Sequence, residues 1–77
     1  MQYIYICVIR LQNGQDLIDG VYNDNYKAMD HRWTSKKLKG FHSTVVQVHE
    51  INIGGPYGYV GILDSKGLPR FFISYDI

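Results

Sequence analysis

Cysteine is nearly absent from this chain of 77 residues, in which Cys7 is the only one. A lone cysteine excludes an internal disulfide, so no crosslink holds the fold together. Cys7 lies inside an apolar run, where a thiol behaves as a small buried hydrophobe, and such usage is typical of a reducing compartment. We therefore expect an intracellular, cytoplasmic protein.

An excess of charge is also lacking, since eight lysines and arginines stand against seven acidic residues and give a formal net charge of +1. This balance excludes the general attraction to nucleic acid or to an anionic membrane that a strongly basic protein has. Either partner would need a local patch of cations.

Long hydrophobic runs are missing as well. The apolar run from Tyr3 to Ile9 is too short to span a bilayer and is followed by Arg10, so we expect a strand there, and neither a membrane span nor a signal sequence. Repeats, linkers and low-complexity segments are absent, and one hydrophobic core has to serve a chain of this length. We expect residues 1–77 to form a single domain.

The first elements that are present predict a hairpin. Both alternating sets of side chains in Gln2–Leu11 are apolar, which is typical of a central strand covered on both faces. Asn13-Gly14 is the pair best able to take the positive φ angles of a type I′ turn, and Leu17–Tyr22 then resumes an apolar pattern.

A helix is predicted from about Asn25 to Leu38. The segment 23–25 supplies candidate N-caps, and Gly40 is able to take the left-handed position after the last turn. A single helical stripe that we expect to lie on the sheet is formed by Tyr26, Met29 and Trp33.

Three further strands follow at Phe41–Ile53, Tyr57–Leu63 and Leu68–Ile77. The last two are joined by Asp64–Gly67, where Asp64 starts a turn and Gly67 takes the left-handed position. The order β-β-α-β-β-β predicts an α+β fold, with a four- or five-stranded antiparallel sheet and one helix packed on one face.

Catalytic and metal-binding patterns are not evident. The histidines and Cys7 lack the spacing of metal ligands, and the aspartates fall at turn and cap positions where they satisfy backbone groups. Cys7 lies in mid-strand, where a thiol is usually inert, and the glycines of 54–61 lack the lysine and the helix of a phosphate-binding loop. We expect no catalysis, no metal and no cofactor.

A mixed basic and aromatic surface is the remaining feature. Clustered cations beside aromatic rings suit contact with a phosphate backbone or a protein groove, whereas the alternative is a solvated helix end favoured by its dipole. Seven tyrosines also exceed what one core can bury, and exposed tyrosine is typical of protein interfaces. The predicted partner-binding residues are Arg32, Lys36, Lys37, Lys39, Lys66, Arg70, Tyr57 and Tyr59.

From residue 25 onward the chain resembles a group of small phage-encoded proteins. A short helix ends in Ser35-Lys36-Lys37, a strand begins with Phe41-His42-Ser43-Thr44-Val45, and a hairpin turns at Asp64-Ser65-Lys66-Gly67. The chain departs from the group in its longer loop at 54–58 and in Leu68-Pro69-Arg70-Phe71, where the relatives have a short basic-Trp ending.

The group includes an anti-CRISPR inhibitor of a type I-F surveillance complex, which binds the effector backbone where target DNA would enter. The resemblance therefore implies a small phage-type inhibitory or regulatory protein that binds a host macromolecular complex without catalysis. It implies contact through Lys36, Lys37, Lys66 and Arg70. The alternative is a small nucleic-acid-binding module that uses the basic helix end and the last hairpin directly. A homodimer formed through exposed strand edges is left open.

Overall fold

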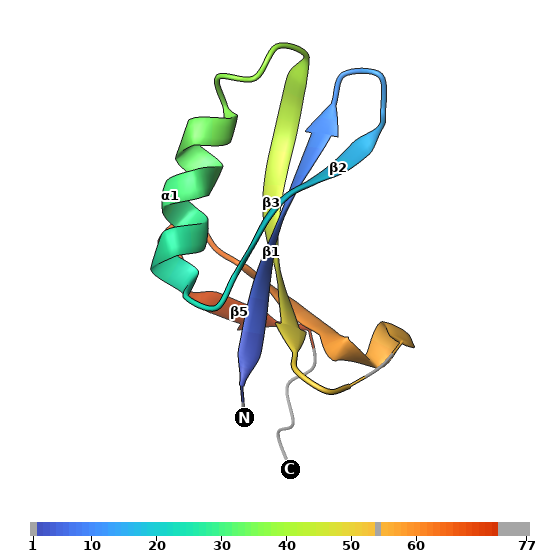
Figure 1. Cartoon of the computed structure of the whole chain (residues 1–77), viewed down its shortest axis with the longest axis vertical. Coiled ribbons are helices and arrows are strands. Elements are labelled where there is room, and N and C mark those ends of the chain that lie inside the picture. Colours follow the sequence, from blue (N-terminus) through green and yellow to red (C-terminus); the bar gives the residue numbers. More distant parts are fainter. Residues whose placement is uncertain (1, 54, 73–77) are drawn as a thin grey trace.

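The chain forms a twisted five-stranded antiparallel sheet with one helix on one of its faces (Figure 1). The computed structural model describes residues 2–53 and 55–72, and the side chains of residues 33–35, 55 and 56 are outside the description. The strand order is β2-β1-β3-β4-β5. The elements are β1 (Tyr3–Leu11), β2 (Asp16–Tyr22), α1 (Asn25–Ser35), β3 (Phe41–Glu50), a 3₁₀ turn η1 (Gly55–Gly58), β4 (Tyr59–Leu63) and β5 (Pro69–Phe71). The predicted α+β architecture is confirmed, with five strands.

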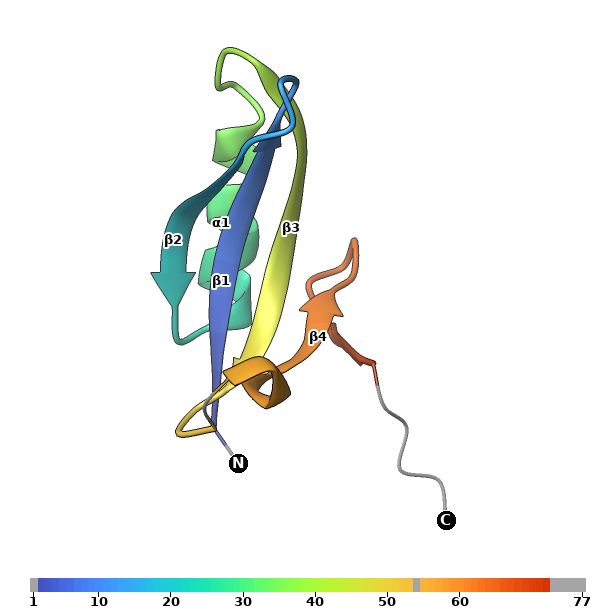
Figure 2. The ribbon, with the colours of Figure 1, turned by 90° about the vertical axis from the view of Figure 1, so that its right-hand side faces the viewer.

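Strand β1 lies at the centre of the long part of the sheet, between β2 and β3. Its odd-numbered residues point toward α1, and Cys7 and Ile9 among them are buried. Within the part of the chain that the structure describes, no element covers the opposite face of β1 (Figure 2). The prediction that β1 is central is confirmed, but its cover on both faces is not found among the described residues.

The core lies between α1 and the middle of the sheet. Ala28 and Met29 of the helix pack onto side chains of β1, β3 and β4. Partly buried Tyr3, Tyr5, Tyr22 and Val60 border this core, whose buried residues are Cys7, Ala28, Met29, Val46, Val48 and Leu63.

Helix α1 is capped at its start and fastened to its surroundings at two points. The Asp24 Oδ1 atom accepts hydrogen bonds from the backbone N–H groups of Tyr26 and Lys27 at 2.8 and 3.2 Å, as expected for an N-cap. The Asn25 side-chain amide donates to the Gly67 carbonyl at 2.8 Å, which ties the start of the helix to the β4–β5 turn. Further along, His31 Nε2 lies 2.7 Å from Asp19 Oδ2 and ties the helix to edge strand β2.

The predicted helical stripe is wrong at Tyr26, whose side chain is 64% exposed. Tyr26 lies two residues before Ala28, which is about 200° around a helix, so a helix that buries Ala28 turns Tyr26 to solvent. Met29 is buried as predicted, and the side chain of Trp33 lies outside the described residues. The helix ends at Ser35 rather than Leu38, so Gly40, with φ of 79°, belongs to the loop before β3 and not to a helix cap.

Two hairpin turns of the same type lie at the two opposite edges of the sheet. In each, a carbonyl accepts from the glycine three residues later, as Leu11 O does from Gly14 N and Asp64 O from Gly67 N. The glycines have φ of 87° and 82°, which is the left-handed residue of a three-residue loop. The predicted left-handed Gly67 is confirmed, but the type I′ turn at Asn13-Gly14 is not, because Asn13 is not among the described residues with positive φ.

The predicted strands after the helix are too long. Strand β3 stops at Glu50, and Asn52 with φ of 70° turns the chain away. The predicted strand from Tyr57 begins only at Tyr59, because η1 comes first. Strand β5 covers Pro69–Phe71, since a proline without an N–H suits only a short edge strand, and residues 73–77 of the predicted strand lie outside the described residues.

The matched glycines allow a test of how the β4–β5 turn packs on α1. A Cβ at Gly67 would lie 2.9 Å from Met29 Cγ, whereas a Cβ at Gly14 meets nothing within 4 Å. Gly14→Ala is expected to cost about 1 kcal/mol from the left-handed backbone alone, and Gly67→Ala about 1 to 3 kcal/mol more from overpacking. Urea unfolding of both variants measures the difference. Equal losses would contradict a packed contact between the turn and Met29.

Candidate interaction surfaces

The positive charge is concentrated at one end of the molecule. Four of the eight lysines and arginines lie between His31 and His49, and no aspartate or glutamate does. The remaining sequence therefore carries a net charge of −3. The exposed Lys36, Lys37 and Lys39 follow the end of α1, in a loop at the upper end of the long axis in Figure 1. We call these three lysines the basic end.

The β1–β2 turn supports the loop of the basic end. The backbone N–H of Gln12 donates to the carbonyl of Gly40 at 2.9 Å, so the two segments lie side by side. Arg32, one turn before the helix ends, is half-buried, and its Nη1 lies 3.9 Å from Met29 Sδ. Its stem therefore contributes to packing as well as to charge.

The predicted basic patch is divided by the fold. Lys66 is exposed in the β4–β5 turn, which the hydrogen bond from Asn25 to Gly67 holds at the first residue of α1. A helix of 11 residues is about 16 Å long, so Lys66 and the basic end lie at opposite ends of it. Arg70 lies on β5, where its Nε donates to Asp64 Oδ2 at 3.0 Å.

The two predicted tyrosines differ in environment. Tyr57 in η1 is 83% exposed. Tyr59 is half-buried and stacks on His49, with ring centroids 5.0 Å apart and an interplanar angle of 10°. The rings of Phe72 and Tyr59 form a T-shaped pair, with ring centroids 5.0 Å apart. Tyr59 therefore belongs to an aromatic group on the sheet face opposite α1, and sequence reasoning had not connected it with His49.

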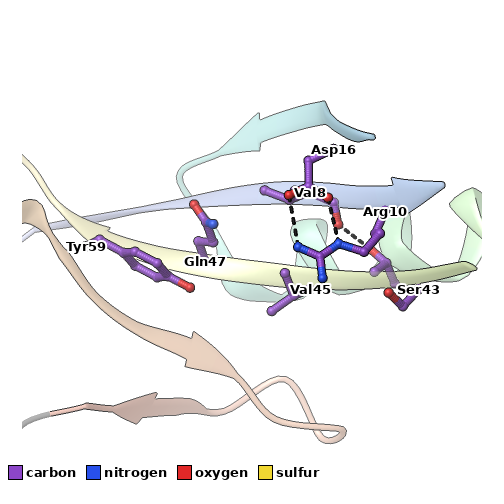
Figure 3. Close-up of a pocket in the computed structure, with 8 residues that line it drawn as sticks. Val8, Arg10, Asp16, Ser43, Val45, Gln47 and Tyr59 are labelled. Atoms are coloured by element: carbon purple, nitrogen blue, oxygen red, sulfur yellow. Dashed lines mark hydrogen bonds and ion pairs between the residues drawn. The ribbon is translucent and has the colours of Figure 1, made fainter. Parts of the chain in front are cut away.

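The uncovered sheet face is the surface that sequence reasoning missed. It holds the side chains of β1 that point away from α1, together with their neighbours in the sheet register. A hollow of about 340 Å³ opens on it, and Tyr59 and Gln47 stand on one side of this hollow with Arg10 and Asp16 on the other (Figure 3). The rest of its lining is Val8, Ser43, Thr44 and Val45.

An ion pair closes one side of the hollow. Arg10 Nε and Nη2 donate to the two carboxylate oxygens of Asp16 at 2.9 and 3.2 Å, in a two-pronged geometry across the β1–β2 hairpin. The hydrogen bond from Arg10 holds the pKa of Asp16 below its usual value. At the β4–β5 hairpin, hydrogen bonds lower the pKa of Asp64. The backbone N–H of Leu68 contributes most, and the backbone N–H of Lys66 and the side chain of Arg70 add to the effect. Both arginines are thus matched by carboxylates within the chain.

The thiol of Cys7 lies in the interior of the protein and is inert. Cys7 is fully buried, and its Sγ lies 3.5 Å from the carbonyl of Ala28. Burial raises the pKa of this thiol to about 11, so the nucleophilic thiolate is scarce at neutral pH. Within the described residues, no group of three or more His, Cys, Asp or Glu side chains is placed to hold a metal ion.

Comparisons with protein families, with curated proteins and with solved structures give no match to this chain. In the part of the chain that the structure describes, no helix has the length and apolar character needed to cross a membrane.

The burial of Cys7 predicts its reactivity. The native protein is expected to react with a thiol reagent at pH 8 far more slowly than the urea-unfolded protein, because the buried thiol is both inaccessible and protonated. Reaction followed by absorbance in the two conditions measures the ratio. Similar rates would place Cys7 at the surface.

His49 predicts a loss of stability in acid. Burial lowers the pKa of His49 below 6.5, so the folded state favours the neutral ring, which stacks on Tyr59 and meets Gln47 Oε1 at 2.9 Å. The unfolded state then binds more protons, so this contribution is present above pH 6.5 and is lost as the pH falls through the folded value. Urea unfolding of the parent and of His49→Phe at pH 7.5 and pH 5 isolates it. The parent should lose more free energy of unfolding than the variant, and an equal loss would contradict the assignment.

Proposed function

We propose that this protein is a non-catalytic inhibitory or regulatory protein of the phage type, which binds a macromolecular complex in the cytoplasm of a host cell. The resemblance from residue 25 onward points to a CRISPR effector as the complex, with binding in a fixed stoichiometry. The observation that carries the proposal is the separation of charge along the molecule. No aspartate or glutamate lies between His31 and His49, the segment that contains the basic end, whereas the rest of the sequence carries a net charge of −3.

The basic end suits recognition of an anionic surface on a large partner. Its lysines are exposed, and they lie on a loop that is held by a backbone hydrogen bond to the β1–β2 turn. Charges at such a place steer the encounter and set the orientation of binding, while apolar and aromatic groups supply most of the contact area. A groove that holds a nucleic acid backbone is itself basic, so the basic end is expected to contact an acidic surface of the complex outside that groove.

Binding is favoured over catalysis by the state of the polar groups. Cys7 is protonated and enclosed, and the carboxylates of Asp16 and Asp64 are each held by an arginine. These arrangements stabilise the fold, and they leave those groups poorly placed to exchange protons with a substrate.

Direct nucleic acid binding is the competing hypothesis, and the positions of Lys66 and Arg70 argue against it. That hypothesis used the last hairpin together with the helix end, but Lys66 lies at the far end of α1 and Arg70 is paired with Asp64. Three lysines in one loop neutralise few phosphates, so duplex DNA should bind feebly.

The proposed function is tested with a purified type I-F surveillance complex and with a DNA duplex as probes. We expect stoichiometric association with the complex and only feeble, strongly salt-dependent association with the duplex. In Lys37→Gln/Lys39→Gln, association with the complex should be slower by about tenfold and less sensitive to salt, because the steering charge is reduced.

The matched control is Lys27→Gln/Lys66→Gln, which removes the same charge outside the basic end. It should associate like the parent protein. Tight binding of the parent to DNA would instead support the nucleic-acid-binding module, and no association with the surveillance complex would exclude that complex as the partner. Equal effects of the two double variants would remove the basic end from the mechanism.

A further inference from the structure

The face of the sheet opposite α1 is apolar along its centre. Ile4, Ile6 and Val8 of β1 point to it, as the alternation with the buried Cys7 and Ile9 requires. The sheet register continues this band onto the neighbouring strands, where the residues on the same face are Ile18 and Val21 of β2, Val45 of β3 and Ile62 of β4.

An apolar band of this kind is unusual on a sheet face that is exposed to solvent. An antiparallel sheet with one solvated face normally alternates apolar residues toward the core with polar residues toward solvent. Here Ile18 is 72% exposed and Val21 is 58% exposed, although both lie on an edge strand where a polar side chain would cost nothing in packing. The double apolar pattern of β1 thus requires a second cover that the described part of the chain does not supply.

The charges on this face are neutralised within the chain. Arg10 pairs with Asp16 at one side and Arg70 pairs with Asp64 at the other. Between the two pairs the side chains are apolar, aromatic or uncharged polar. A neutral apolar band fits another neutral apolar surface, and it does not fit the charged backbone of a nucleic acid.

We propose that a second copy of this chain covers the face, in a two-fold, antiparallel, sheet-on-sheet homodimer. A neutral apolar band is complementary to a copy of itself, and the charge distribution along the long axis favours the antiparallel orientation. The molecule measures 44 × 23 × 22 Å, with the basic end at one extremity, whereas toward the other the acidic Asp24 and Glu50 are accompanied by Lys27 and Lys66. Turning a second copy end for end keeps the two basic ends apart and places each beside a part of its partner with mixed charge, whereas a parallel arrangement brings the two basic ends together.

The available area suits a dimer of modest affinity. With about 3.3 Å per residue and about 4.8 Å between strands, the face over β2, β1, β3 and β4 is about 30 by 17 Å, or about 500 Å² per copy. Two such faces give about 1,000 Å² in all, which is the lower limit for a specific interface, so dissociation at micromolar concentration is expected. The hollow beside Tyr59 gives room for side chains of the partner.

The proposal is tested with the purified protein alone, independently of the proposed function. Sedimentation velocity over a range of concentrations should show a reversible dimer. Ile18→Lys places a charge in the apolar band and should weaken the dimer by about tenfold or more. The matched control is Tyr26→Lys, which adds the same charge at a similarly exposed side chain on the solvent side of α1. It should leave the dimer unchanged.

The orientation is tested with a spin label on Lys37→Cys, since Cys7 is buried and unreactive. The antiparallel dimer predicts a label-to-label distance comparable with the long axis of one molecule. A short distance would overturn the antiparallel arrangement. Sensitivity of the dimer to Tyr26→Lys but not to Ile18→Lys would overturn the choice of face. A parent that remains monomeric would overturn the proposal as a whole and leave the face for a different kind of protein.

Discussion

The close approach of α1 to the middle strands of the sheet is the contact on which the rest of the structure depends. Ala28 is fully buried, and its carbonyl lies 3.5 Å from the thiol of Cys7. Two small side chains at this point allow a helix of only 11 residues to sit on three strands at once. Since no disulfide is available, this contact and the two polar ties at Asn25 and His31 fix the helix. A larger residue at position 28 or 7 would lift the helix from the sheet.

The same contact determines where the polar and charged groups lie. Burial of Ala28 turns Tyr26 to solvent, and the tie from Asn25 to Gly67 holds the β4–β5 turn under the first turn of the helix. Lys66 is carried with that turn, whereas the lysines of the basic end leave from the last turn. One helix thus separates two groups of cations that lie on short, exposed segments of the chain. It also leaves the opposite sheet face uncovered, because a single helix packs on only one side.

Local signals in the sequence predicted the elements well. The N-cap at Asp24 and the left-handed Gly67 follow from side-chain and backbone chemistry within a few residues, and the structure has both. The face that the helix buries was harder to predict, because Tyr26 and Ala28 both belong to apolar stripes and only contact with the sheet decides between them. The split of the predicted basic patch depends on a hydrogen bond between residues 42 positions apart, which no local pattern contains. The sequence did indicate the uncovered face, because both alternating sets of side chains in β1 are apolar. This pattern was interpreted as a strand that other elements of the same chain cover on both faces.

The two proposed surfaces do not compete for the same residues. The basic end lies at an extremity of the long axis, beyond the centre of the apolar band, so a sheet-on-sheet dimer would leave its lysines accessible along their outer side. An antiparallel dimer would then carry two basic ends, far apart and facing opposite directions. A partner with one anionic site would bind each half of such a dimer separately. A partner with repeated sites at a matching distance would bind both halves at once, and its affinity would gain from the effective concentration of the second contact. If the proposed function and the proposed dimer both hold, the spacing of anionic sites on a partner, more than the affinity of one basic end, would decide which complex the dimer binds.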